Sequence, residues 1–295
     1  MKIATAPVNW NNNDVRDYRP WTPYPQLIDE MVKAGYTATE WDISMDSDAA
    51  RVRSDLQARR LTMLGRFVGL ELRNPDKRTA EIERGLEIAR FLKAIGGAYL
   101  IAADSGDARR WQEAGHVDPA GGLTAAQWRS LGEGLNELGR RVREEGMQVV
   151  FHNHVGTYVE TEDETSRLLD ETDPGLVGWC LDCGHLTYGG GDTLRMLGRY
   201  GDRVTYVHLK DVDGNVLERS RTEGWSFPQA LKNFIFAPLG EGIAQVPDVV
   251  QALKSHGYDG WVVIEQDTTP DEPTQNAARN RQYLETILRK AGANE

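Results

Sequence analysis

The sequence predicts an α/β protein with a single (β/α)8 TIM-barrel domain over residues 1–295. Eight short apolar segments alternate with segments of helical periodicity. The alternation continues without a change in composition, which favours one closed parallel barrel over two domains. The turn Thr5–Val8 after the first strand is not rich in glycine, which counts against a doubly wound sheet, the alternative fold.

The first half of the chain is expected to supply four strands. Helical spacing is clear in Leu27, Ile28, Met31 and Val32, and Gly35 ends that helix. The expected elements are strand 2–6, helix 24–34, strand 36–42, helix 48–59, strand 61–67, helix 79–95 and strand 98–102. A long polar loop follows the fourth strand.

The second half is expected to complete the barrel and to end in a C-terminal helix. The expected elements are helix 124–145, strand 147–152, helix 162–171, strand 176–181, helix 193–200, strand 203–209, helix 247–256, strand 260–265 and helix 274–291. The two longest loops follow strands four and seven. Such loops are typical of a barrel that builds its site from strand-to-helix connections.

Composition narrows the classes of function. A hydrophobic content of 40% and a charged content of 27% are typical of a soluble globular protein. The net charge of −11 argues against nucleic acid as a partner. The lack of an apolar run of about 18 residues argues against a membrane span. Two cysteines imply no disulfide framework, and Met1 leads into a strand without a signal peptide, so we expect a cytoplasmic protein.

Polar side chains end the last four predicted strands. These side chains belong to four sequence segments: Phe151–His154, Leu181–His185, Val207–Asp211 and Val262–Asp267. The carboxyl ends of parallel strands meet at one mouth of a barrel, so these imidazoles and carboxylates predict a metal site there. The alternative, a lone polar residue that caps each strand, is a weaker explanation when three strands in succession carry one.

Two cysteines at Cys-x-x-Cys spacing, Cys180 and Cys183, do not predict a zinc or redox site. Cys180 lies inside a strand, where a separation of three places the two sulfurs on opposite faces. A small core residue and a turn residue explain them better. Asn9 and Trp10 directly follow the first strand and are candidate substrate contacts, whereas Asn11–Asn13 are expected in a solvated loop.

Other candidates have a structural and a functional explanation. Glu40 ends strand two and is a candidate substrate contact as a ligand at the mouth, or else a surface acid. Lys210 and Asp211 are either a catalytic base with its orienting partner or an ion pair at a strand end. Arg221 and Trp225 belong to the loop after strand seven, which forms either a lid over the substrate or a solvated segment.

These sequence segments resemble motifs of the xylose isomerase-like barrel superfamily of sugar isomerases, epimerases and dehydratases. The motifs that carry the resemblance are Leu181–His185, Val207–Asp211 and Glu265. Within the superfamily, the chain is most similar to the inosose (2-keto-myo-inositol) dehydratase family. That similarity lies in Ile3–Trp10, Gly35–Glu40, His152–Thr157 and Gly260–Asp267. It extends from residue 3 to about residue 285.

The resemblance implies one divalent metal held by Glu, Asp, His and Glu. Asp182, His208 and Glu265 match the last three ligands. His152 stands where the family has its first glutamate, so we predict that Glu160, eight residues later, supplies the fourth ligand, with His152 as the alternative. Mn²⁺ or Co²⁺ is the expected ion, and Zn²⁺ and Mg²⁺ suit the same ligands.

The resemblance also implies roles for the remaining histidines. His152 is predicted to contact the substrate and His154 to contact it or act as an acid or base. His185 matches a substrate-contacting position of the family. With Lys210 and Glu265 they supply the candidate catalytic groups.

The implied reaction is dehydration of 2-keto-myo-inositol by a carbon–oxygen hydro-lyase of inositol catabolism. A base removes the proton next to the ketone, the metal holds the enolate charge as a Lewis acid, and an acid protonates the departing hydroxyl. His154 or Glu265 is the predicted base, and His185 or Lys210 the predicted acid. The two assignments stay open.

Two other functions could be built on the same barrel and side chains. A sugar or sugar-phosphate isomerase or epimerase would reprotonate the enediolate instead of expelling hydroxide. A barrel that only binds carbohydrate would leave the Asp, His and Glu set unexplained. Apurinic endonucleases share the barrel, but the acidic balance counts against that activity. The expected partner is therefore a small polyol or sugar, and homo-oligomerisation is left open.

Overall fold

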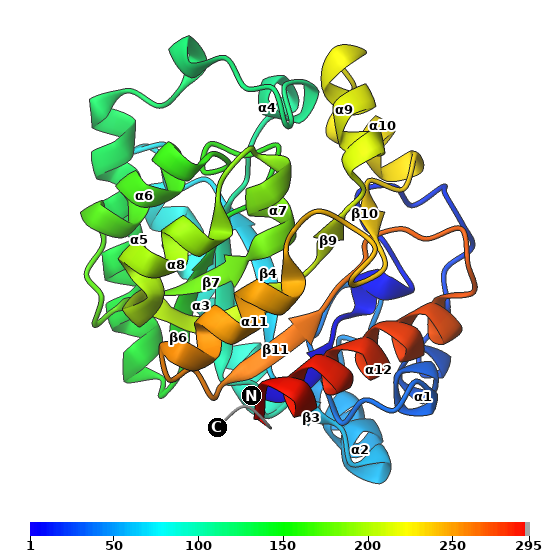
Figure 1. Ribbon diagram of the computed structural model, residues 1–295. Coiled ribbons are helices and arrows are strands. Elements are labelled where there is room, and N and C mark those ends of the chain that lie inside the picture. The colour runs from blue at the N-terminus through cyan, green and yellow to red at the C-terminus, as the bar shows by residue number, and fades with distance from the viewer. Residues whose placement is uncertain (293–295) are drawn as a thin grey trace.

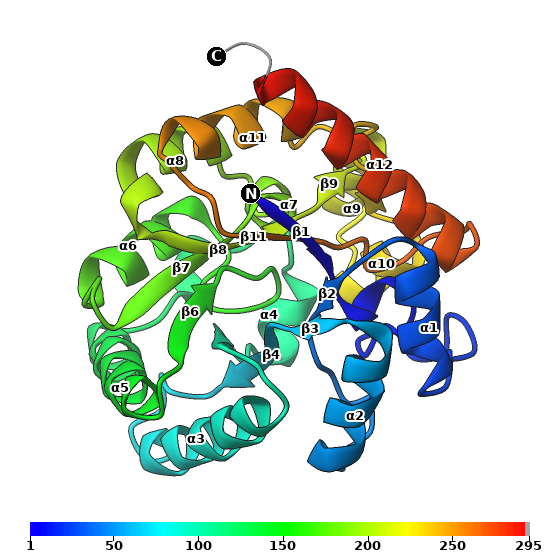
Figure 2. The ribbon, with the colours of Figure 1, turned by 90° about the horizontal axis from the view of Figure 1, so that it is seen from below.

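The centre of the computed structural model, which describes residues 1–292, is a ring of parallel strands (Figures 1 and 2). Their spatial order is β3 (Thr62–Met63), β2 (Ala38–Thr39), β1 (Lys2–Thr5), β11 (Trp261–Ile264), β8 (Val204–Leu209), β7 (Val177–Asp182), β6 (Gln148–His152), β5 (Tyr99–Asp104) and β4 (Gly65–Leu70). Neighbouring strands in this order run parallel. The predicted (β/α)8 barrel is confirmed.

The ring closes at Leu64, which interrupts the strand predicted over residues 61–67. The Leu64 N–H donates to the Thr39 carbonyl at 2.9 Å. The Leu64 carbonyl accepts from the N–H groups of Ala98 and Tyr99, at 2.8 and 3.0 Å. One predicted strand therefore becomes β3 and β4, which lie at the two ends of the open sheet order and are joined by a single residue.

Eight helices of residues 1–292 form the outer layer around the strands, as the view along the barrel in Figure 2 shows. They are α1 (Gln26–Lys33), α2 (Ala49–Arg59), α3 (Arg78–Ala94), α5 (Ala125–Glu144), α6 (Glu162–Glu171), α8 (Thr193–Tyr200), α11 (Val246–Ser255) and α12 (Pro273–Gly292). Capping boxes from Thr124 and Thr161 fix the starts of α5 and α6. Within the described part of the chain, no helix combines the length and apolar character needed to cross a lipid bilayer.

Short helices gather at the carboxyl ends of the strands, in the upper half of Figure 1. They are α4 (Ala108–Gln112), α7 (Cys183–Tyr188), α9 (Gly214–Thr222) and α10 (Phe227–Lys232). The last two lie in the long loop after β8, between the antiparallel strands β9 (Asp211–Val212) and β10 (Phe236–Ala237). A separate buried apolar cluster, which includes Phe227 and Phe236, holds this segment together.

The polar residues at the mouth of the barrel lie directly above an apolar layer in its lumen. Val150, Cys180, Tyr206 and Val263 belong to one buried cluster in the lumen. Each lies two residues before a polar residue of the predicted site, and side chains two apart on a strand share a face. The pleat therefore directs His152, Asp182, His208 and Glu265 to the mouth, above this apolar layer.

Asp211 anchors the loop after β10 and is not the partner of Lys210. Its carboxylate accepts hydrogen bonds from the N–H groups of Gly240, Gly242 and Ala244, at 2.9, 3.1 and 2.9 Å. The interpretation of Lys210–Asp211 as a base with its orienting partner is wrong. Neighbouring side chains on an extended chain point to opposite faces, so Asp211 points away from the ammonium.

Candidate active site

A cavity of about 270 Å³ opens at the carboxyl end of the barrel. Its lining is Ala6–Val8, Asn13–Asp14, Glu40–Ile43, Arg66–Phe67, His152, His154, His208, Lys210, Glu265 and Asp267. The predicted mouth of the barrel is thus a real pocket. Six of the residues predicted from the sequence line it: Glu40, His152, His154, His208, Lys210 and Glu265.

Four donor atoms from four neighbouring strands converge at the base of this cavity. His152 Nε2 lies 3.0 Å from His208 Nδ1 and 3.3 Å from Asp182 Oδ2. His208 Nδ1 lies 3.2 Å from Glu265 Oε2 and 3.8 Å from Asp182 Oδ2. The four side chains are at most 7% exposed. Two imidazoles and two carboxylates thus share one small buried volume.

This donor set fits a divalent transition metal. Asp182 Oδ2 is buried and receives no hydrogen bond, so a cation would satisfy an oxygen that lacks a hydrogen-bond donor. The other carboxylate oxygen, Oδ1, accepts the His185 N–H at 2.8 Å and caps α7, which fixes the orientation of the group. Imidazole and carboxylate donors together suit Mn²⁺, Co²⁺ or Zn²⁺.

Glu160 does not belong to this set, so its prediction as the fourth ligand is wrong. Its Oε1 accepts from the Gly115 N–H at 2.7 Å and its Oε2 from the Gly156 N–H at 2.6 Å. Both oxygens are committed to two loops outside the cluster. Burial raises the pKa of Glu160 to about 7. His152, the alternative ligand, lies with Asp182 and His208 in the cluster instead.

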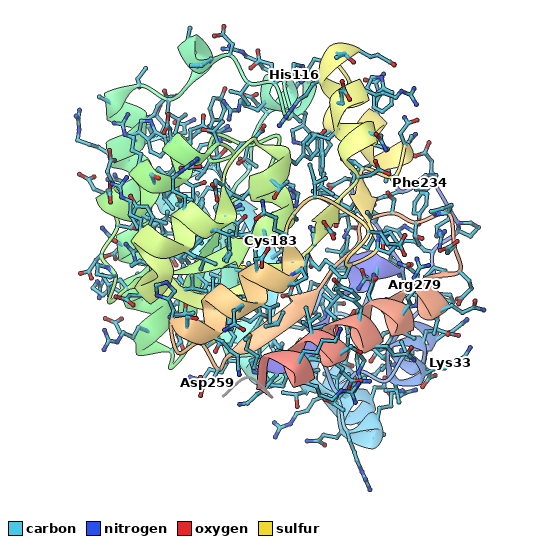
Figure 3. All side chains as sticks on the ribbon, viewed as in Figure 1. Lys33, His116, Cys183, Phe234, Asp259 and Arg279 are labelled. Carbon is cyan, nitrogen blue, oxygen red and sulfur yellow. The ribbon has the colours of Figure 1, made fainter. Side chains whose placement is uncertain are left out.

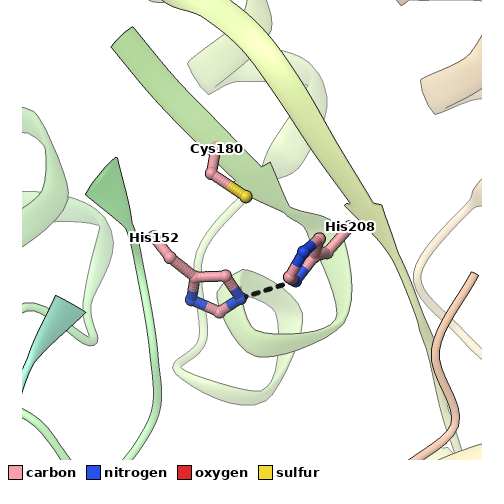
Figure 4. Close-up of side chains that lie close together, drawn as sticks. All are labelled: His152, Cys180 and His208. Carbon is pink, nitrogen blue, oxygen red and sulfur yellow. Dashed lines mark hydrogen bonds between the residues drawn. The ribbon is translucent and has the colours of Figure 1, made fainter. Parts of the chain in front are cut away.

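Cys180 lies in the lumen close to the two imidazoles (Figure 4). The donor atoms of His152, Cys180 and His208 all fall within 4.8 Å of one another. Burial raises the pKa of Cys180 to about 11, so the thiol is neutral. Cys183, labelled in Figure 3, points elsewhere and donates to the Lys210 carbonyl at 3.1 Å. Both thiols are free, as expected.

Lys210 holds a buried positive charge next to the four donors. Its Nζ lies 3.0 Å from Glu265 Oε2, 2.9 Å from Asp267 Oδ1 and 3.5 Å from Asp182 Oδ2. Burial opposes the charge, but Asp267, Glu265 and Asp182 together raise the pKa of Lys210 well above its ordinary value. An ammonium group therefore faces the cavity. Asp267 was not predicted, although its position two residues after Glu265 was an available signal.

His154 and His185 stack with ring centroids 3.9 Å apart but have different access to the cavity. His154 lines it, and its Nδ1 lies 2.6 Å from the Val155 carbonyl, which can only accept. The proton is therefore on Nδ1, and Nε2 keeps a lone pair. Burial, with His152 and Lys210 nearby, lowers the pKa of His154 to about 3.

His185 lies behind Lys210. It is completely buried, is not part of the cavity lining, and its Nε2 accepts from Lys210 Nζ at 3.0 Å. Burial lowers the pKa of His185 well below its ordinary value. The predicted direct contact of His185 with substrate is therefore wrong, because Lys210 stands between the ring and the cavity.

Asn9 and Trp10, predicted as substrate contacts, are structural. Asn9 Nδ2 donates to Thr5 Oγ1 at 2.7 Å and to the Ile264 carbonyl at 2.9 Å, and its Oδ1 accepts from the Gln266 N–H at 2.6 Å. These bonds join the ends of β1 and β11. Trp10 is buried, and its Nε1 donates to Thr274 at the start of α12 at 3.0 Å.

Arg221 and Trp225 also lie away from the cavity lining. Arg221 donates to the carbonyls of Gly115 and Tyr188 at 2.9 and 2.8 Å, and so links the loops after β5 and β7. Trp225 Nε1 donates to Glu223 at 2.9 Å. The structure therefore does not place either side chain, predicted as a substrate contact, in the lining of the cavity.

The outer wall of the cavity was missed from the sequence. It consists of Asn13, Asp14, Asp42, Arg66 and Phe67. Phe67 is 39% exposed, and its ring centroid lies 5.4 Å from those of both His152 and His154. Asn13 and Asp14 follow β1, Asp42 follows β2, and Arg66 and Phe67 lie within β4, where no histidine or repeated motif marks them. Asn13, expected in solvent, instead donates to Asp42 at 3.1 Å.

Comparisons with known proteins agree with this fold. The sequence model of the family described as "Xylose isomerase-like TIM barrel" matches residues 28–287. Inosose dehydratase of Geobacillus kaustophilus is 32% identical over 98% of this chain and 95% of its own length. Inosose dehydratase of Lacticaseibacillus casei is 32% identical over 98% and 97%.

Solved structures share the fold at lower identity. The IolI protein with a bound zinc atom aligns with a TM-score of 0.74 at 15% identity, over 99% of both chains. L-ribulose 3-epimerase aligns with a TM-score of 0.74 at 14% identity, over 100% of this chain and 97% of its own. The chain therefore belongs to the xylose isomerase-like TIM barrel family, with relatives of matching length among the inosose dehydratases.

Proposed function

We propose that the protein is a metal-dependent hydro-lyase that dehydrates 2-keto-myo-inositol. The observation that carries the proposal is the convergence of His152, Asp182, His208 and Glu265 beside the Lys210 ammonium at the base of one cavity. The inosose dehydratases that match over almost the whole chain support the choice of substrate.

His152, Asp182, His208 and Glu265 would hold the metal. When bound, the ion would act as a Lewis acid towards the ketone and a neighbouring hydroxyl of the substrate. Mn²⁺ or Co²⁺ is our preferred ion, and Zn²⁺ is supported by the zinc atom of the IolI structure. The neutral His152 in place of a carboxylate increases the share of nitrogen donors, which favours these ions over Mg²⁺.

His154 is the proposed base and Lys210 the proposed acid. His154 lines the cavity and its Nε2 keeps a lone pair, so it would take the proton from the carbon next to the ketone. Lys210 carries a proton that it can give to the departing hydroxyl, which leaves as water. The substrate loses one C–H and one C–O bond and gains a carbon–carbon double bond. Glu265, the other candidate base, is committed to the metal set.

A ketose isomerase or epimerase is the second candidate. L-ribulose 3-epimerase and D-allulose 3-epimerase structures share the fold, and proton removal next to a carbonyl is common to both reactions. The buried ammonium of Lys210 favours the hydro-lyase, because expulsion of hydroxide requires a proton donor. In either case we propose a small polyol or sugar as the substrate and the cytoplasm as the location.

The test is to remove metal with a chelator, add back Mn²⁺ or Co²⁺, and follow 2-keto-myo-inositol by the ultraviolet absorbance of the conjugated product. We expect absorbance to grow only after metal is restored. A protein that binds metal but forms no product would contradict the dehydratase assignment, and ketose epimerisation would then be assayed. Product without metal would contradict the proposed role of the four donors.

A further inference from the structure

Glu40 reaches across the barrel to the far edge of the His208 ring. It directly follows β2, whereas His208 belongs to β8, three places away in the strand order. Glu40 Oε1 lies 2.8 Å from His208 Nε2 and 2.9 Å from the Tyr206 hydroxyl. All three side chains are buried, with Glu40 only 3% exposed. The sequence predicted Glu40 as a substrate contact, and these bonds give it another role.

The contact with Glu40 determines where the proton lies on His208. A carboxylate offers only acceptor oxygens, so the ring must donate its Nε2–H to Glu40. When the ring is neutral, as metal ligation requires, its Nδ1 atom carries the lone pair. Nδ1 is the atom that faces His152 Nε2 and Glu265 Oε2, at 3.0 and 3.2 Å. The tautomer that Glu40 imposes is therefore the one that a metal ligand requires.

Tyr206 holds Glu40 in turn. Tyr206 lies two residues before His208, on the same face of β8, and its hydroxyl donates to the same carboxylate oxygen. A buried carboxylate is stable only when it is hydrogen-bonded or paired, and two neighbours on one strand meet that need. Glu40, Tyr206 and His208 thus form a small rigid unit in the lumen.

Glu40 and Glu265 approach opposite edges of the same ring. Glu265 contacts Nδ1 and Glu40 contacts Nε2. The three residues fall within one 4.8 Å group, but the imidazole separates the two carboxylates. Because Glu40 Oε1 already accepts two hydrogen bonds, it is better suited to hold the ring than to bind the ion.

We propose that Glu40 is a positioning residue that orients His208 and fixes its tautomer for metal binding. The inference rests on the metal site of the proposed function but does not depend on the substrate. A carboxylate that accepts the second N–H of a ligating histidine also makes the ring a stronger donor. Loss of such a partner typically weakens metal affinity by about 10–100-fold.

The experiment measures Co²⁺ binding by the full chain, without substrate, through competition with a chelator and through the visible spectrum of bound Co²⁺. The variants are Glu40→Ala, Glu40→Gln and Tyr206→Phe. The matched control is Glu160→Gln, which changes another buried carboxylate that contacts none of the four donors. Thermal unfolding of each variant checks that it is folded.

We expect Glu40→Ala to weaken Co²⁺ affinity by about 10–100-fold and to change its spectrum. Glu40→Gln retains an acceptor oxygen but loses the charge, so a smaller loss is expected. Tyr206→Phe should weaken affinity slightly, and Glu160→Gln should not. If Glu40→Ala does not fold, Glu40→Gln carries the comparison.

Unchanged Co²⁺ affinity and spectrum in the folded Glu40 variants would overturn the inference. If the same Glu40 variants also had a higher KM for 2-keto-myo-inositol than wild type, Glu40 would be identified as a substrate contact. Since no substrate enters the binding measurement, this failure is distinct from failure of the dehydratase assignment, which appears only as lack of turnover by metal-loaded wild-type protein.

Discussion

Lys210 and Asp267 form an ion pair at the base of the cavity, with Nζ and Oδ1 2.9 Å apart and both side chains at most 4% exposed. Asp267 follows the metal-set residue Glu265 by two positions, so both carboxylates face the same ammonium. The pair keeps one proton donor next to the proposed metal ligands. It also places a positive charge next to the proposed site of the metal ion.

Replacement of Lys210 with Met should separate catalysis from metal binding. We expect turnover to fall by about 10²–10⁴-fold, because the proton donor is removed. Metal affinity should rise, because the ammonium lies 3.0 Å from Glu265 and 3.5 Å from Asp182 and repels a second cation. Turnover assays and Co²⁺ titration measure the two effects. Weaker metal binding would contradict the assignment of Lys210 as an acid outside the ligand set.

Replacement of His152 should weaken metal binding, in contrast to replacement of Glu160. His152→Ala removes a donor atom 3.0 and 3.3 Å from two other members of the set. Glu160→Gln alters a side chain that binds only the N–H groups of Gly115 and Gly156. Metal content after dialysis against a fixed Co²⁺ concentration compares the two. Loss of metal in Glu160→Gln alone would restore Glu160 as the ligand.

The His154→Gln variant should retain metal and lose turnover. Its ring is absent from the four converging donors, and its Nε2 lone pair is the proposed base. We expect kcat to fall by about 10²–10⁴-fold with unchanged Co²⁺ affinity. A variant that loses metal together with activity would identify His154 as a ligand. A variant that keeps activity would leave proton removal to Glu265.

The sequence predicted the barrel and three of the four converging side chains, Asp182, His208 and Glu265, for one physical reason. Strand pleat has a period of two, so an apolar residue two positions before a polar one identifies the polar residue at the mouth. This holds for Cys180 and Asp182, Tyr206 and His208, and Val263 and Glu265. The order of the strands then brings these ends together.

Contacts made across loops could not be predicted in the same way. Glu160 lies in a loop, and nothing in its spacing shows that two backbone N–H groups capture its carboxylate. Asp42 follows β2 and Arg66 lies within β4, and both line the cavity without a distinctive motif in the sequence. Glu40 was recognised as a residue of the mouth, but its partner His208 lies on the opposite side of the barrel.

Glu160 should make stability depend on pH. Burial raises its pKa from 4.5 to about 7, so the folded state retains a proton that the unfolded chain releases first. The contribution of Glu160 to the free energy of unfolding is therefore largest below pH 4.5, and it is lost as the pH rises through 7. At about 1.4 kcal/mol per pKa unit, the loss is on the order of 3 kcal/mol.

The Glu160→Gln variant removes that titration. Urea unfolding of wild type and variant at pH 5 and pH 8 measures the difference in free energy of unfolding. Between pH 5 and pH 8, we expect the free energy of unfolding of the variant to rise relative to that of wild type by about 2–3 kcal/mol. An unchanged difference would mean that the Gly115 and Gly156 N–H groups stabilise the charged carboxylate enough to cancel the effect of burial.

Asn9 offers a test of the division between scaffold and site. Asn9→Ala breaks three buried hydrogen bonds and leaves the Gln266 N–H without its acceptor, so we expect a decrease of about 2–4 kcal/mol in the free energy of unfolding.

The Asn9 amide joins β1 to the end of β11, and it is not part of the cavity lining. KM for 2-keto-myo-inositol should therefore stay within about twofold of wild type at a temperature where the variant is folded, because a side chain outside the pocket supplies no binding energy to the substrate. Urea unfolding and steady-state kinetics measure the two quantities, with Asn9→Asp as the matched variant that retains the acceptor oxygen. A large rise in KM with unchanged stability would make Asn9 the substrate contact that its position after the first strand predicted.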